Sequence, residues 1–206
     1  MKLYLAPYAP NPRRVTMFIA EKGIADIDLI QLDLQKGEHR TEEFRRKSPF
    51  AQIPTLELDD GRCLTESRAI CQYLEALHPE PNLMGADAFE RAFIEMWDRR
   101  MELMFSVPLM LWVRHGNPVL AMLERNQSAE VASFNQGQAM RMAKRLNDEL
   151  ASRPWIAGDR FTIADITAAC GMDFAKMMQW RPGDDLPHLK AWRARIADRP
   201  AGKVAA

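Results

Sequence analysis

The spacing of apolar residues changes once along the chain, and this change limits the fold more than any other feature. Up to about residue 78, short apolar runs alternate with helical periods, whereas from Phe89 onward every apolar pattern is helical. The stiff, proline-containing segment that starts at His78 separates the two patterns. We therefore predict a sheet-containing domain at 1–78, a linker at 79–88 and an all-helical domain at 89–206.

The first domain has the element order of a mixed sheet covered by helices. The expected order is a strand, a helix that ends at Gly23, a strand, a short helix near Thr41, a hairpin and a final helix. The strands are predicted at 2–6, 26–34, 54–58 and 62–64, and the last helix at 65–77. This order predicts an α/β domain.

The second domain reads as a series of long helices. They are predicted at 89–114, with a break near Pro108, and at 129–150, 162–178 and 187–197. Thr162 and Asp165 have the spacing of a capping box, in which the side chain of each residue accepts a hydrogen bond from the backbone N–H of the other. We expect Asp165 to be buried and to have a structural role.

Charge and composition exclude some classes of function. Lys plus Arg equals Asp plus Glu at 28 each, so the chain lacks the positive excess that favours bulk nucleic acid or an anionic membrane surface. No apolar run approaches the roughly 20 residues that span a bilayer, and the N-terminal residues do not form a signal peptide. The three cysteines fit neither a disulfide framework nor a metal site, so we expect a cytoplasmic protein.

Four stretches, in this order and spacing, resemble the cytosolic glutathione transferase superfamily. They are 9–15 (APNPRRV), 51–56 (AQIPTL), 65–70 (TESRAI) and 158–166 (GDRFTIADI). The first stretch is most similar to the bacterial and theta-, delta- or Nu-like groups. The resemblance implies a thioredoxin-like N-terminal domain followed by an all-α domain, and a homodimer. It also implies that glutathione is the co-substrate and a small apolar electrophile the acceptor, as in detoxification.

The resemblance also implies which residues bind glutathione. It implies a cis bond between Ile53 and Pro54, with the backbone of the pre-proline residue pairing with the cysteinyl unit. The acid at Glu66 would hold the α-ammonium of the γ-glutamyl unit, and Ser67 its carboxylate. The implied binding set is completed by Gln52, Arg68 and His39, with Lys36 also near the glycyl end. From the residues alone, the same stretches also read as an edge-strand proline and as helix capping.

The turn that should stabilise the glutathione thiolate departs from the family pattern. The related groups place a hydroxyl or thiol at or next to position 9, whereas this chain has Ala9 and Pro10. A free thiol has a pKa of about 8.5, so a donor is needed to hold it ionised near neutral pH. By elimination we select Asn11, expected as the N-cap, whose amide could also donate to sulfur. A cap without catalytic function is the alternative, and Tyr8 is a second candidate donor.

Methionines and aromatic residues crowd the long helix after the linker. Such a stripe forms core in most proteins, but the resemblance implies that part of it lines the acceptor pocket. The predicted pocket residues are Tyr8, Met101, Met104 and Phe105. The remaining histidines show no spacing for metal or triad chemistry, so no metal site is expected.

Three functions remain open at this point. The first is an enzyme that adds glutathione to apolar electrophiles. The second is a glutathione-dependent disulfide reductase or peroxidase, which the missing hydroxyl favours. The third is a binding protein of the same fold without activity. Fold alone does not choose among them.

Overall fold

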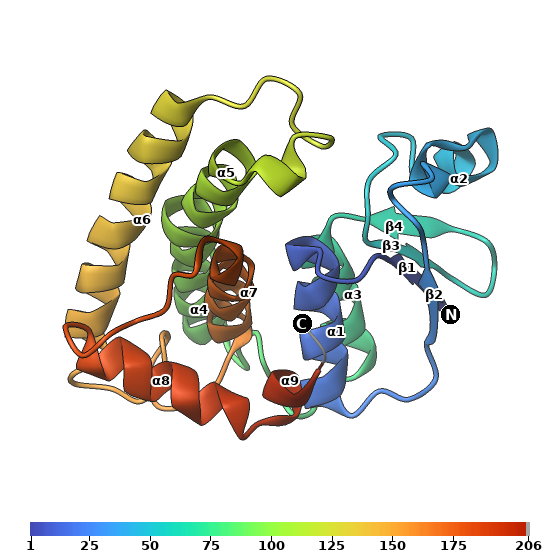
Figure 1. Ribbon diagram of the computed structural model, residues 1–206. Helices are drawn as coiled ribbons and strands as arrows, with labels where there is room; N and C mark the ends of the chain where they lie inside the picture. The colour runs from blue at the N-terminus through green and yellow to red at the C-terminus, as the bar shows by residue number, and fades with distance from the viewer. Residues whose placement is uncertain (205–206) are drawn as a thin grey trace. The chain divides into compact units, whose positions relative to one another are not determined.

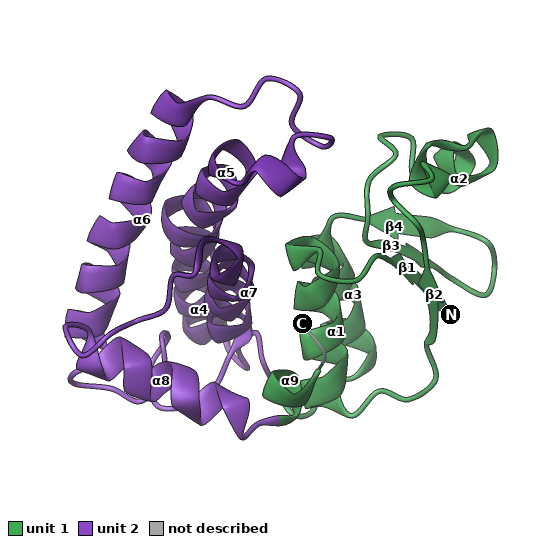
Figure 2. Ribbon diagram, in the orientation of Figure 1, with its two compact units in different colours: residues 1–81, 200–206 green, residues 82–199 purple. Residues whose placement is uncertain are grey.

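The computed structural model describes residues 1–204 and divides the chain into two compact units. Unit 1 contains Met1–Pro81 together with the residues from Pro200 onward, and unit 2 contains Asn82–Arg199 (Figure 2). The final helix of the described chain therefore belongs with the N-terminal unit, although it follows the helical unit in sequence.

Unit 1 is built on a four-stranded mixed sheet with the strand order β2-β1-β3-β4. The strands are β1 (Lys2–Leu5), β2 (Asp28–Gln31), β3 (Thr55–Glu57) and β4 (Cys63–Thr65). β1 pairs with β2 in parallel, and the other two pairs are antiparallel. The predicted α/β domain is confirmed, but β1, β2 and β3 are shorter than expected, most of all the exposed edge strand β2, and β4 is shifted by one residue.

Helices α1 (Pro10–Lys22) and α3 (Ser67–Leu77) lie side by side against this sheet (Figure 1). Their shared core with β1 and β3 is fully buried and apolar. It includes Leu3, Val15, Phe18, Leu56, Ile70 and Leu74. α1 ends as predicted at Gly23, whose φ of 64° is the left-handed conformation that glycine adopts without strain. The smaller elements are η1 (Glu38–Arg40), α2 (Glu42–Lys47) and α9 (Pro200–Lys203).

Apart from one isolated β-bridge between Trp155 and Gly158, the regular secondary structure described in unit 2 is helical (Figure 1). The helices are α4 (Ala88–Met101), η2 (Glu102–Ser106), α5 (Val107–Gly116), η3 (Pro118–Leu120), α6 (Ala129–Glu149), α7 (Ile163–Ala175), η4 (Lys176–Met178) and α8 (Pro187–Ala197). α7 is buried along nearly its whole length and forms the centre of this unit. The predicted all-helical half is therefore confirmed.

The expected break near Pro108 has a specific form. Residues Glu102–Ser106 are π-helical, directly before α5. Pro108 has no N–H to donate and its ring crowds the carbonyl four residues earlier, so the preceding turn widens. The same place is a close contact with α7: Ser106 Oγ donates to the Thr167 carbonyl at 2.7 Å. A Cβ at Gly171 would meet Ser106 at 2.7 to 2.9 Å, so only glycine fits there.

The predicted capping box at the start of α7 is confirmed. The Thr162 N–H donates to Asp165 Oδ2 at 2.9 Å, and both reciprocal contacts are present. Asp165 is fully buried and also accepts from the Ile156 N–H and from Trp192 Nε1, at 3.0 and 2.7 Å. Burial outweighs these donors and raises the pKa of Asp165 to about 6. No helix of the described chain is both long enough and apolar enough to cross a bilayer.

Candidate functional site

Strand register brings three turns of unit 1 to one edge of the sheet. Thr55, the first residue of β3, pairs with Tyr4 near the end of β1 and with Thr65 at the end of β4. The turn after β1, the turn before β3 and the turn after β4 therefore leave the sheet at the same edge. These turns carry most of the residues that the sequence singled out.

Each of these turns also holds a residue in the left-handed backbone region. Tyr8, Ala51 and Glu66 have φ values of 65°, 54° and 64°. Non-glycine residues adopt this conformation at a cost of about 1–3 kcal/mol, and such residues cluster at ligand sites. One further non-glycine residue with positive φ, Gln179, lies in unit 2. The distribution marks this edge of the sheet as the candidate site.

The first turn of α1 corrects one expectation. The helix begins at Pro10 with Ala9 as its N-cap, so Asn11 lies inside the first turn and is not the cap. The Arg13 N–H donates to the Ala9 carbonyl at 3.2 Å. Because the first N–H groups of a helix have no intrahelical acceptor, the prolines at 10 and 12 lose nothing there. The preference of a pre-proline residue for extended backbone predicts Asn11 as the cap, but Asn11 is helical here although Pro12 follows it.

This placement leaves the Asn11 amide open to a ligand. The side chain is exposed, and it makes no hydrogen bond to any residue that the structure describes. Tyr8, the second candidate donor, is 76% exposed. Tyr8 lies in the turn between β1 and α1, and Asn11 lies in the first turn of α1; both side chains are exposed.

The turn before β3 is held by side chains that leave one peptide unit free. The Ile53–Pro54 bond is cis, as the resemblance implied. Ser48 Oγ accepts from the Gln52 N–H at 3.1 Å and donates to the Gln52 carbonyl at 2.9 Å, and Thr55 Oγ1 donates to the same carbonyl. Among the described residues, the N–H and C=O of Ile53 have no partner. An extended peptide could pair with them.

The N-terminus of α3 lies beside this turn. The helix starts at Ser67, later than the predicted Thr65, and the exposed Glu66 is an N-cap without a side-chain cap. The capping alternative is therefore wrong at this helix. The first intrahelical bond runs from the Ile70 N–H to the Glu66 carbonyl, so the backbone N–H groups before Ile70 have no intrahelical acceptor. Such a terminus binds carboxylates.

Ser67 is buried, and its hydroxyl oxygen accepts from Arg14 Nη1 at 2.9 Å. Because the guanidinium occupies one lone pair, the Ser67 O–H is left to donate to a ligand oxygen. Arg14 was not among the predicted site residues, because no local spacing signals a contact between residues 53 positions apart. Ser48 was not predicted either, although its partner Gln52 is close in sequence. Arg68, half-buried, follows Ser67 in the first turn.

His39 differs from a solvated loop histidine. It lies in η1 and is buried, with Nε2 accepting from Arg40 Nε at 3.2 Å. Its Nδ1 is buried and has no hydrogen-bond partner within the described chain. Burial, followed by the charges of Arg40 and Arg45, lowers the pKa of His39. The ring is therefore neutral near pH 7, with a free N–H at Nδ1. Lys36 is exposed and paired with Asp33.

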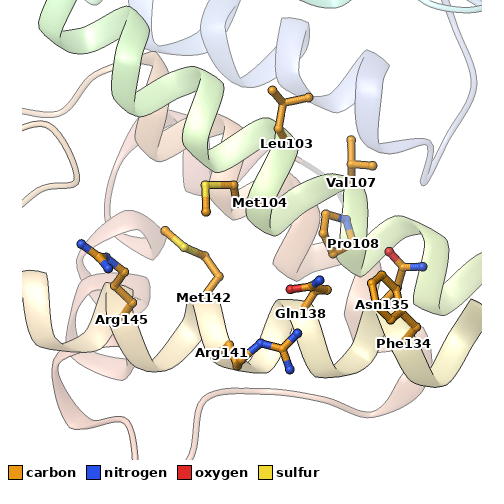
Figure 3. A pocket seen from close by; sticks show the side chains of 10 residues that line it. All are labelled: Leu103, Met104, Val107, Pro108, Phe134, Asn135, Gln138, Arg141, Met142 and Arg145. Atoms are coloured by element: carbon orange, nitrogen blue, oxygen red, sulfur yellow. The ribbon is translucent and has the colours of Figure 1, made fainter.

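The residues expected in an acceptor pocket are divided between core and surface. Met101 and Phe105 are fully buried in unit 2, and Phe105 packs edge-on against Trp180. They belong to the core and present no surface to a substrate, which corrects that expectation. Met104 is 53% exposed and lines a cavity between α5 and α6 (Figure 3). No group of three or more potential metal ligands lies together within residues 1–204.

Comparison with known proteins agrees with this geometry. The family description "Glutathione S-transferase, N-terminal domain" matches residues 3–82, and "Glutathione S-transferase, C-terminal domain" matches residues 107–200. Glutathione S-transferase 2 of Saccharomyces cerevisiae is 34% identical over 98% of this chain and 88% of its own length.

Two solved structures superpose along almost the whole chain. A glutathione S-transferase domain-containing protein of Marinobacter aquaeolei has a TM-score of 0.92 and 41% identity, over 98% of this chain and all of that one. Gtt2 of S. cerevisiae also has a TM-score of 0.92, with 33% identity over the full length of both chains. On the two domain matches and these full-length relatives, the chain belongs to the glutathione transferase family.

Proposed function

We propose that this protein is a glutathione transferase that adds glutathione to small apolar electrophiles, as detoxifying members of the family do. The observation that carries the proposal is the unpaired peptide unit of Ile53 beside the open N-terminus of α3. These two features offer a peptide ligand both a strand-like partner and a carboxylate site. Relatives named as transferases favour this activity over disulfide reduction, peroxide reduction or binding without turnover.

Each end of glutathione has a chemically suitable partner in unit 1. The γ-glutamyl carboxylate would accept from the Ser67 O–H and from the first N–H groups of α3, while the Glu66 carboxylate would hold the α-ammonium. The cysteinyl unit would pair with the backbone of Ile53. Gln52, Pro54 and Arg68 complete the proposed glutathione site. The glycyl carboxylate would accept from His39 Nδ1, which burial keeps neutral and unpaired.

The first turn of α1 would stabilise the thiolate of glutathione. Asn11 presents an exposed amide there, and the positive end of the helix dipole favours an anion. The anionic sulfur would then attack the electrophilic carbon, forming the C–S bond as the leaving group departs with its electron pair. The exposed ring of Tyr8 provides apolar surface beside the sulfur for the acceptor.

The test is a comparison of three reactions with the full chain and glutathione. We expect conjugation to a chloronitrobenzene, followed by the absorbance of the thioether product, to exceed reduction of hydroxyethyl disulfide and of an organic hydroperoxide. The Ile53→Pro variant removes the backbone N–H that the proposal assigns to the cysteinyl unit. Disulfide or peroxide reduction without conjugation would contradict the proposal.

We also propose a homodimer that acts in the cytoplasm. Dimerisation is typical of the family, and α4 carries Phe89, which is 77% exposed and stacks on the half-buried Phe93 with a ring-centroid distance of 6.0 Å. An exposed aromatic side chain such as Phe89 favours an isologous interface. The three cysteines are free thiols, as in a reducing compartment.

A further inference from the structure

Ser48 is a buried residue outside the set assigned to glutathione. It directly follows the last residue of α2, and its side chain is fully buried. Its N–H donates to the Phe44 carbonyl at 2.9 Å, in the last hydrogen bond of that helix. The segment that starts at Ser48 leads to the cis peptide bond between Ile53 and Pro54, just before β3 (Figure 1). Ser48 therefore connects α2 to the turn that presents Ile53.

The loop 48–52 is closed by Ser48 itself, through both its carbonyl and its hydroxyl. The Ser48 carbonyl accepts from the Ala51 N–H at 2.8 Å. The Ser48 Oγ accepts from the Gln52 N–H at 3.1 Å and donates to the Gln52 carbonyl at 2.9 Å. Because the same residue ends α2 and closes the loop, it fixes the loop to the end of the helix.

The backbone of Ala51 shows that the loop needs this closure. Its φ of 54° lies in the left-handed region, which a residue with a Cβ adopts only at a cost in free energy. The hydrogen bonds from its own N–H and from the next N–H, both to Ser48, offset this cost. Without the Ser48 hydroxyl, we expect Ala51 to relax and the following peptide units to move.

The same hydrogen bonds determine which peptide unit is available to a ligand. The N–H and C=O of Gln52 are both occupied by Ser48, and Thr55 Oγ1 donates to the same carbonyl at 3.1 Å. Among the described residues, the N–H and C=O of Ile53 have no partner. An extended peptide therefore pairs with Ile53 and not with Gln52. A shift of one residue would turn each side chain of the bound peptide, its thiol included, to the opposite face.

We propose that Ser48 is a positioning residue for the cysteinyl unit of glutathione. It acts on the ligand only through Ile53, by closing the loop and by occupying the peptide groups of Gln52. The inference rests on the proposed function, in which the cysteinyl N–H donates to the Ile53 carbonyl and the cysteinyl carbonyl accepts from the Ile53 N–H. Removal of the hydroxyl therefore affects the binding of glutathione and not the binding of the acceptor or the attack by sulfur.

Steady-state kinetics of Ser48→Ala separate binding from turnover. The variant frees both polar groups of Gln52 and releases the loop, so the KM for glutathione should rise about tenfold. The kcat at saturating glutathione and the KM for a chloronitrobenzene should change by less than about twofold. Leu74→Val is the control, since it shortens a fully buried side chain of unit 1 and lowers stability without altering the loop. It should leave all three constants unchanged.

A second measurement distinguishes positioning from a general loss of structure. Titration calorimetry compares S-methylglutathione with an analogue in which an ester oxygen replaces the cysteinyl N–H. The wild type should bind the analogue about tenfold more weakly, because the analogue cannot donate to the Ile53 carbonyl. In Ser48→Ala this ratio of affinities should fall to about twofold or less, because Ile53 is no longer held for pairing and the two changes are coupled.

Three outcomes would overturn the proposal. The same affinity ratio in the wild type and in Ser48→Ala would show that Ser48 and the pairing at Ile53 act independently. An equal rise in the KM for glutathione in Leu74→Val would indicate a general effect of lost stability. Both outcomes leave the proposed function intact, because the wild type still binds S-methylglutathione. A wild type that does not bind S-methylglutathione would overturn the proposed function together with the role of Ser48.

Discussion

Arg14 Nη1 lies 2.9 Å from Ser67 Oγ and joins the first helix of unit 1 to the N-terminus of α3. Both side chains are buried. The contact fixes the Ser67 oxygen as an acceptor and leaves its proton to donate, at the end of a helix whose first N–H groups have no intrahelical acceptor. The pair thereby prepares a carboxylate site before any ligand arrives.

Removing either γ-glutamyl contact should weaken glutathione binding. Ser67→Ala and Glu66→Ala should each cost about 1–3 kcal/mol of binding free energy, because each leaves a charged group of the ligand unmatched. Titration calorimetry measures the change. Ser152→Ala, which removes an exposed hydroxyl from unit 2, should leave the affinity as it is. Unchanged affinity in both site variants would refute the assignment.

Asp165 should give folding stability a distinctive pH dependence. Its pKa is raised from 3.8 to about 6 in the folded chain, so the folded state binds more protons than the unfolded state between these values. Its contribution to stability is therefore largest at low pH and falls as pH rises from about 4 to about 6, by about 3 kcal/mol.

Urea unfolding of the wild type and of Asp165→Asn isolates this group, because all other titrations are common to both chains. The stability difference between the two should change across this window and stay constant above it. A difference that is flat from pH 4 to pH 7 would show that Asp165 titrates normally despite its burial.

The two methionines on either side of the α4–η2 boundary should behave differently. Met101 is fully buried, so Met101→Ala should lower the free energy of unfolding by about 2–5 kcal/mol. Met104 is half-exposed, and Met104→Ala should cost less than about 1 kcal/mol. Denaturant titration of both variants decides whether Met101 is core. Similar small losses of unfolding free energy in both variants would contradict the placement of Met101 in the core.

The proposed homodimer predicts a mass of twice 23.6 kDa at micromolar concentration. Sedimentation equilibrium measures it directly. Phe89→Ser should shift the equilibrium toward the single chain, because it removes the exposed ring that stacks on Phe93. Val119→Ser removes a similarly exposed apolar side chain from the segment after α5 and should not. A single-chain mass for the wild type would contradict the homodimer.

Local patterns predicted the elements whose causes are local. The helix stop at Gly23, the capping box at Thr162 and the helix at 187–197 all depend on residues within one or two turns, and all three appear in the structure. The mixed sheet followed from alternating strand and helix periods. The cis bond at Pro54 came from family resemblance and not from physical reasoning.

Features that depend on distant contacts could not be predicted in the same way. His39 is buried because of the packing of η1, and nothing in its neighbouring sequence indicates this. Phe105 belongs to the core, where it packs edge-on against Trp180 from a distant part of the chain. Asn11 fails as an N-cap because two prolines fit the donor-free first turn together.

The central claim is that the Asn11 amide stabilises the thiolate of bound glutathione in this chain, in place of the hydroxyl that related groups use. Because Ala9 is the N-cap, Asn11→Ala removes the amide and leaves the capping of α1 intact. A hydrogen bond to a charged group is worth about 1.5–3 kcal/mol, and one pKa unit corresponds to about 1.36 kcal/mol. Losing the amide should therefore raise the pKa of the bound thiol by about one to two units.

Asn11→Asp replaces the donor with a negative charge next to the sulfur and should raise that pKa at least as far. The decisive measurement is the ultraviolet absorbance of the thiolate in bound glutathione, followed against pH for the wild type and both variants at saturating ligand. The account predicts a wild-type pKa below the value of about 8.5 for a free thiol, and an upward shift in each variant. Identical titrations in all three proteins would contradict it and would indicate that Tyr8 or the backbone of the first helical turn stabilises the thiolate.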